Sequence, residues 1–106
     1  MQARVMSSRD EYTKYALLAQ LDTQNVQNPQ DMASMWGEIT NLCDEIGVSI
    51  EQSYAALGQF DFLVIVDAQS RDLVLKAALI MERHGLDVQT MGIFPTEQFA
   101  EIVSDL

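Results

Sequence analysis

Cysteine and histidine, the residues that form disulfides and most structural zinc sites, are nearly absent from the chain. Cys43 is its only cysteine and His84 its only histidine. One cysteine allows no intrachain disulfide and no paired-cysteine metal motif, and the two residues together cannot form a zinc site within one chain. Cys43 lies in an apolar stripe of helical spacing, where a thiol usually behaves as a small buried hydrophobic group. We therefore predict no bound metal or cofactor and assign both residues to structural roles.

Positive charge is also scarce, with 6 lysines and arginines against 16 aspartates and glutamates and a formal net charge of -10. Residues 31–45 and 97–105 each contain acidic side chains and no cation. Such an acidic surface repels nucleic acid and anionic lipid headgroups, so we expect neither as a partner. We interpret the acidic stretches as a solvated face that keeps the protein soluble, with a docking surface for a basic protein partner as the alternative.

Long apolar runs are missing as well. None approaches the roughly 20 residues that a membrane-spanning helix requires, so we expect no membrane insertion. Residues 1–13 are polar and lack the apolar core of a signal peptide, which makes the cytoplasm the expected location. We expect residues 1–13 to be a flexible tail, or an arm that exchanges with a neighbouring subunit. Residues 14–106 then form a single domain with one modest hydrophobic core.

The apolar periodicity of residues 14–106 predicts four strands and three helices. In chain order these are strand 14–21, helix 29–46, strand 48–57, strand 60–67, helix 71–84, strand 86–94 and a short helix after residue 95. Pro29 suits the first position of a helix, and Ser70 suits an N-cap. Gly47 and Gly85 suit helix ends. This is the order of the ferredoxin-like βαββαβ fold, an α+β fold whose four-stranded antiparallel sheet carries its helices on one face, here with a C-terminal helix added.

The strand at residues 60–67 is apolar on both of its faces. Its even-numbered apolar residues, beginning with Phe60, suit a core beneath the helices. Leu63 and Ile65 have the opposite parity and fall on the open face of the sheet, with Leu57, Met91 and Ile93 beside them. Contiguous apolar surface of this kind marks an interface. The simplest way to bury it is to pack two sheets face to face, which predicts a homodimer, or a higher oligomer, of the dimeric α+β barrel type.

Few side chains could carry chemistry. Gly58 most simply supplies the positive φ of a turn, and Asp61 either accepts hydrogen bonds there or lines a cavity between the paired sheets. Carboxylates in a cleft of low dielectric can act as general acids or bases, so Glu51 and Asp61, with Tyr54 nearby, are candidate catalytic residues, although none is assigned. Glu51 and Tyr54 have opposite parities, and a register slip in strand 48–57 would exchange their faces. Neither a nucleotide-binding loop nor a hydrolase or kinase signature is present.

Two segments carry a resemblance to a known family. The first is Leu57-Gly58-Gln59-Phe60-Asp61 followed by Leu63-Val64-Ile65-Val66-Asp67-Ala68, which resembles the Gly-aromatic-Asp signature of the GYD domain family. The second is residues 91–99, which are similar to the strand and acidic helix that close the family's domain. Phe60 stands where the family usually has tyrosine, so any role of that hydroxyl is missing here. The resemblance implies a dimeric α+β barrel and no activity, because the family is known chiefly as a domain of unknown function. The residues of the motif and of the expected interface are Gly58, Phe60, Asp61, Leu63 and Ile65.

We therefore expect a GYD-like homo-oligomeric domain of uncharacterised function, which binds a small molecule or a protein partner without catalysis of its own. The alternative is an enzyme similar to the cofactor-independent monooxygenases and isomerases of the dimeric α+β barrel type. Its candidate groups are Glu51, Tyr54 and Asp61, with His84 as a further possibility. Fold analogy alone supports the enzyme, since one fold hosts many functions. The sequence leaves open whether the protein is an enzyme.

Overall fold

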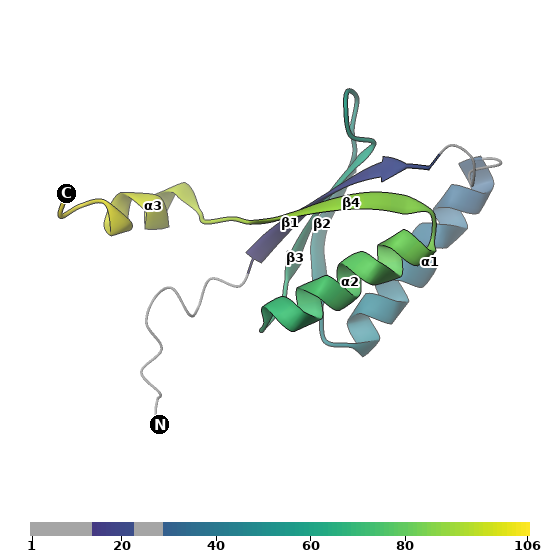
Figure 1. Cartoon of the computed structure of the whole chain (residues 1–106), viewed down its shortest axis with the longest axis horizontal. Helices are drawn as coiled ribbons and strands as arrows, with labels where there is room; N and C mark the ends of the chain where they lie inside the picture. The colour runs from purple at the N-terminus through teal and green to yellow at the C-terminus, as the bar shows by residue number, and fades with distance from the viewer. Residues whose placement is uncertain (1–13, 23–28) are drawn as a thin grey trace.

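Figure 1 shows the computed structural model of the chain, which describes residues 14–22 and 29–106. Its elements are β1 (Lys14–Leu21), α1 (Pro29–Glu45), β2 (Ser49–Ala55), β3 (Phe62–Asp67), α2 (Arg71–Arg83), β4 (Leu86–Gly92) and α3 (Thr96–Ile102). The predicted order of strands and helices is confirmed, although β2 and β4 each end two residues earlier than expected. The expected N-terminal tail, residues 1–13, and residues 23–28 of the first loop lie outside the described residues.

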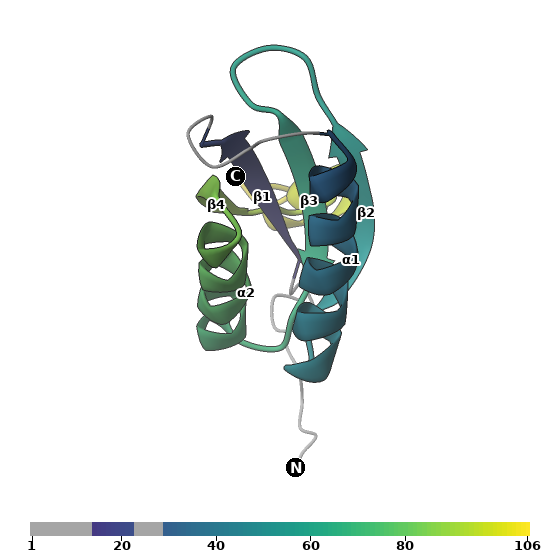
Figure 2. The ribbon, with the colours of Figure 1, turned by 90° about the vertical axis from the view of Figure 1, so that its right-hand side faces the viewer.

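The four strands form one antiparallel sheet in the order β2-β3-β1-β4. Helices α1 and α2 lie side by side on one face of this sheet, and the other face carries neither of them (Figure 2). This arrangement confirms the ferredoxin-like α+β fold. Within residues 14–22 and 29–106, no helix combines the length and the apolar character needed to cross a membrane.

The hydrophobic core fills the space between the two helices and the sheet. Val64 and Val66 of β3 are fully buried in it, as their parity predicts. Phe62 packs at the border of the core, where its ring meets the Trp36 ring of α1 edge-to-face with centroids 5.0 Å apart. Cys43 is also fully buried, and this burial raises the pKa of its thiol. The thiol is therefore neutral at pH 7 and contributes to packing.

Local sequence signals set the ends of both long helices. Helix α1 begins at Pro29, and α2 begins after Ser70, whose hydroxyl accepts a hydrogen bond from the Leu73 backbone N–H at 3.2 Å. Gly47 and Gly85 follow the two helices with a φ of +91° each. That left-handed conformation strains residues with a Cβ atom, which explains why glycine stands at both ends.

The link between β2 and β3 is longer than the tight hairpin that we predicted, because it spans residues 56–61. Leu57 therefore lies on this loop, fully exposed, and not beside Leu63 on the sheet. Phe60 precedes β3 and is half-buried, so its predicted place in the core beneath the helices is wrong. Gly58 has a φ of +128° at the tip of the loop. A Cβ atom at this position would meet no other atom within 4 Å, so space does not require glycine there. The positive φ of the backbone does.

We predict that Gly58→Ala lowers the free energy of unfolding by about 1–2 kcal/mol, because alanine strains the positive-φ backbone. Gly37→Ala is the matched control, because Gly37 lies inside α1 and a Cβ atom there also meets nothing within 4 Å. In a helix interior this change stabilises by about 0.5–1 kcal/mol. Urea unfolding followed by circular dichroism measures both, and effects of the same sign would contradict the prediction.

Candidate functional site

The open face of the sheet carries a band of apolar side chains. Residues paired across antiparallel strands share a face, and the register pairs Leu63 with Leu18 and Ile65 with Ala16. Because Val64 faces the helices, its neighbours Leu63 and Ile65 face away from them, as the sequence predicts. We call the resulting set the open-face band, and its members are Ala16, Leu18, Tyr54, Leu63, Ile65 and Met91.

A β-bulge in the edge strand β2 decides which of its side chains join this face. Ile50 pairs with Val66 but Gln52 pairs with Ile65, so Glu51 is an extra residue between them. A bulge of this kind re-aims side chains and kinks its strand. As a result, Gln52 stands opposite Ile65 on the open face, and the register places Tyr54 there too. The bulge thus settles the register of strand 48–57, which the sequence left open.

Glu51 forms an ion pair with Lys14, the first residue of β1. The Lys14 Nζ donates a hydrogen bond to the Glu51 Oε1, and both side chains are about one-third exposed. This hydrogen bond raises the pKa of Lys14, and the nearby charges of Glu51 and Asp67 add to the effect, while desolvation opposes it. Lys14 is thus fully charged at neutral pH, and its ammonium group carries three N–H donors.

A pocket of about 420 Å³ lies beside this ion pair, and we call it the Lys14 pocket. Its lining combines three polar side chains with an apolar wall, and the residues are Lys14, Glu51, Gln52, Ile65, Ile93, Phe94 and Pro95. Ile65 belongs both to this lining and to the open-face band, so the two surfaces are continuous. Volumes of 300–1,000 Å³ are typical of sites that bind small molecules.

The hairpin motif is fastened to the end of β1 by hydrogen bonds. The Asp61 carboxylate accepts one from the Leu21 backbone N–H at 2.8 Å, and the Asp61 N–H donates another to the Ala19 carbonyl oxygen at 2.8 Å. The Gln20 side chain donates to the Gln59 carbonyl oxygen at 2.6 Å. The acceptor role that the sequence suggested for Asp61 is therefore directed at β1, not at the amides of its own turn.

Comparison with models of known protein families identifies the family of this chain. A model of the GYD domain matches residues 15–103, which is nearly the whole chain. The chain belongs to the GYD domain family. Comparison with the curated proteins and with the solved structures gives no match. In this GYD domain the signature, Gly58 to Asp61, forms the β2–β3 hairpin and holds it to β1.

A second pocket, of about 270 Å³, could not be predicted from the sequence. It lies between α1 and the edge strand, and its lining residues are Trp36, Ser53, Tyr54, Ala55 and Phe62. The indole nitrogen of Trp36 is buried and has no hydrogen-bond partner among the described residues. Trp36 occupies an apolar position at helical spacing, and this pattern gave no sign that its ring also lines a pocket.

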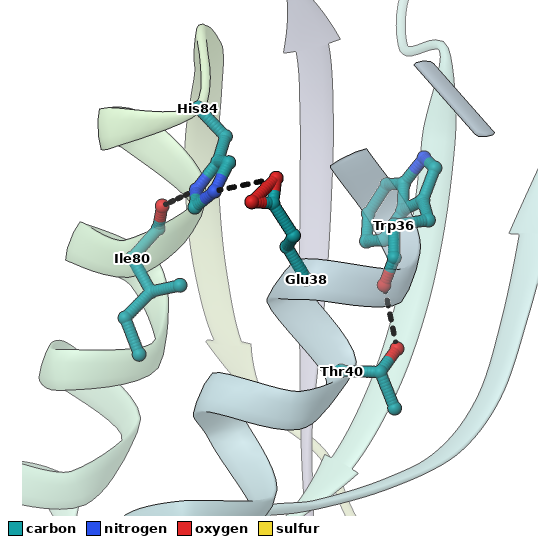
Figure 3. A network of polar contacts seen from close by, with 5 residues as sticks. All are labelled: Trp36, Glu38, Thr40, Ile80 and His84. Atoms are coloured by element: carbon teal, nitrogen blue, oxygen red, sulfur yellow. Dashed lines mark hydrogen bonds and ion pairs between the residues drawn. The ribbon is translucent and has the colours of Figure 1, made fainter. Parts of the chain in front are cut away.

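His84 lies between the two long helices (Figure 3). Its Nδ1 is 2.8 Å from the Ile80 carbonyl oxygen, and its Nε2 is 4.0 Å from the Glu38 Oε1 of α1. The side chain is thus partly buried at the junction of the helices. This contact supports the packing of α1 on α2 and lies away from both pockets.

The three candidate catalytic residues do not converge in the described part of the chain. Glu51 lines the Lys14 pocket, Tyr54 lines the pocket beside Trp36, and Asp61 is bonded to the end of β1. Among residues 14–22 and 29–106, no three histidine, cysteine or acidic side chains are grouped so that they could hold a metal ion.

We predict that Asp61→Ala lowers the free energy of unfolding by about 1–3 kcal/mol, because the partly buried Leu21 N–H loses its acceptor. Asp61→Asn keeps an oxygen that can accept this bond and should recover most of the loss. Asp87→Ala, which removes an exposed carboxylate from β4, is the control and should change stability by at most about 0.5 kcal/mol. Chemical denaturation compares the three, and equal losses for both Asp61 variants would refute the hydrogen-bond assignment.

Proposed function

We propose that this GYD domain is a homodimeric binding module that pairs through the open face of its sheet and holds a small molecule in the Lys14 pocket. The observation that carries the proposal is the continuity of the open-face band with the pocket through Ile65. A second sheet that covers the band would also cover the side of the pocket next to it.

The polarity of the open face favours pairing with a second copy. Met91 is 48% exposed and Tyr54 is 51% exposed, and they flank Leu18, Leu63 and Ile65 without a charged side chain between them. The net charge of -10 therefore does not oppose contact at the centre of this face. Burial of apolar surface stabilises a dimer by about 25 cal/mol per Å². Two sheets that pack face to face lie about 10 Å apart, which leaves room for their side chains to interdigitate.

The lining of the Lys14 pocket indicates the chemistry of the ligand. Ile65, Ile93 and Phe94 provide an apolar wall, and Lys14 provides N–H donors at the polar side. Glu51 already neutralises the single charge of Lys14, so the pocket does not demand a fully charged ligand. These features fit a small molecule with an apolar body and one end that accepts hydrogen bonds.

The dispersal of the candidate groups supports binding without catalysis. General acid–base or nucleophilic chemistry needs reactive groups within hydrogen-bond reach of one another or of a shared substrate. Only Glu51 lines the Lys14 pocket, whereas Tyr54 belongs to the open-face band and borders the pocket beside Trp36, and Asp61 is bonded to the end of β1. The enzymatic alternative therefore has one candidate group at the site in place of three.

We predict that Met91→Asp weakens the dimer by roughly a hundredfold or more, because two carboxylates are then buried without partners at a two-fold interface. Leu75→Asp is the matched control, since Leu75 is 60% exposed on α2, away from the open face. Sedimentation equilibrium at micromolar concentration measures both. Ile65→Asp should dissociate or unfold the protein, whereas a wild-type chain that sediments as a monomer would overturn the proposal.

We predict that the wild-type protein binds 1-anilinonaphthalene-8-sulfonate, a probe with an aromatic body and one anionic end, with a rise in fluorescence. Phe94→Ala removes part of the apolar wall and Lys14→Met removes the donors, so each should weaken binding by about tenfold. Leu75→Ala, an equally exposed site elsewhere, should leave the affinity unchanged. Native mass spectrometry of freshly purified protein tests for a retained natural ligand, and equal effects of all three variants would contradict the assignment of the pocket.

A further inference from the structure

Helix α3 exposes apolar side chains that the proposed dimer does not use. Phe99 is 61% exposed and Ile102 is 45% exposed, and the helix packs extensively against no other described helix or strand. Figure 1 shows it beyond the end of β4, at the opposite side of the molecule from α1 and α2. A helix of 7 residues is too short to be stable in water without tertiary contacts. Its apolar stripe therefore requires a partner surface.

The polar side of α3 is acidic. Glu97 and Glu101 are one turn apart on the side of the helix away from Phe99, and neither forms an ion pair with a described residue. Gln98 is the buried residue of the helix, and its amide has no hydrogen-bond partner among the described residues. The surface that receives α3 should therefore combine apolar and basic side chains.

One surface of the described chain has this combination, and we call it the α1–α2 groove. It has a volume of about 400 Å³ between the two long helices, and its lining residues are Leu42, Glu45, Ile46, Lys76, Leu79, Ile80 and Arg83. Leu79 is 47% exposed there. Lys76 and Arg83 recur at helical spacing with Leu79 and Ile80, so they flank one apolar stripe of α2.

The two cations of the groove are unusual in this acidic protein. Lys14, Arg71, Lys76 and Arg83 are the four lysines and arginines of residues 14–22 and 29–106. Lys14 is paired with Glu51, whereas Lys76 and Arg83 form no ion pair within the described part of the chain. The groove, whose lining also includes Glu45, thus has two cations outside any ion pair beside exposed apolar surface, and α3 has two carboxylates outside any ion pair beside exposed apolar surface.

We propose that α3 of one copy docks in the α1–α2 groove of a second copy. Phe99 and Ile102 would pack on Leu79 and Ile46, in the way that an amphipathic helix fills an apolar groove. In this pose Glu97 and Glu101 lie on the outer side of a helix about 10 Å wide, about one Debye length from the basic rim at 0.1 M salt, so their attraction to it is strong only at low ionic strength. The partner is a second copy because α3 lies at the far end of its own domain from this groove (Figure 1).

This contact joins two different surfaces. Reciprocal exchange of α3 closes a pair of copies, and together with pairing through the open face it builds assemblies larger than a dimer. It does not depend on the open face of the sheet, and the two contacts can be tested separately. Met91→Asp acts on the open face alone, whereas changes at Lys76 and Arg83 act on the groove alone.

The test reverses the charges of the groove and then those of the helix. The variant K76E/R83E should lose the larger assembly in sedimentation velocity, and the backbone amides from Phe99 to Val103 should exchange at least about tenfold faster. Adding E97K/E101K to it should restore both, and this fourfold variant has the net charge of the wild type. Arg71→Glu, which reverses an exposed cation of α2 outside the groove, should change neither measurement. Raising the salt concentration should weaken the contact.

The apolar part of the contact has its own test. Phe99→Ser should release α3 as K76E/R83E does, and it leaves the net charge unchanged. If the α3 amides stay protected in K76E/R83E, α3 docks at another surface and the proposal is overturned. If they stay protected at dilutions where the wild type is monomeric, α3 packs on its own chain, which overturns the proposal as well.

Discussion

The fold depends on one constraint, which is that the paired strands β1 and β3 must be shielded from water on both faces. Side chains alternate along a strand, so the same residues that send Val64 and Val66 into the core send Leu63 and Ile65 to the opposite side. Helices α1 and α2 satisfy the first face within one chain. The second face has no such cover in the described residues, and for this reason the binding surface and the self-association that we propose both involve one apolar band.

Much of this architecture could be predicted from the sequence because the relevant signals are local. Pro29 and Ser70 mark helix starts through backbone chemistry, and the parity of residues 62–66 assigns each side chain to a face. The β-bulge could not be predicted, since Glu51 lies in an exposed edge strand whose polar residues follow no apolar alternation. The hairpin was expected to be tight because Gly58 marks its tip, but glycine reports a backbone angle and not the length of a loop.

The candidate site could also be predicted only in part from the sequence. The sequence singled out Glu51, Tyr54 and Asp61 individually, yet their separation is set by the bulge and by the hydrogen bond from Leu21, which are properties of the folded sheet. Lys14 was missed, because its ion pair joins residues from strands that are separated in the sheet by β3. The pocket beside Trp36 could not be predicted either, since a residue that packs at the edge of a core and one that lines a pocket have the same spacing along a helix.

The bulge at Glu51 also bears on the solubility of the protein. β2 is an edge strand, and its outer side presents backbone N–H and C=O groups that a strand from another molecule could pair with. An extra residue in the middle of the strand interrupts the regular spacing of those groups and increases the local twist. A flat incoming strand can then match only one half of the edge at a time. The same irregularity that turns Glu51 toward Lys14 therefore protects the sheet from growing edge to edge into an aggregate.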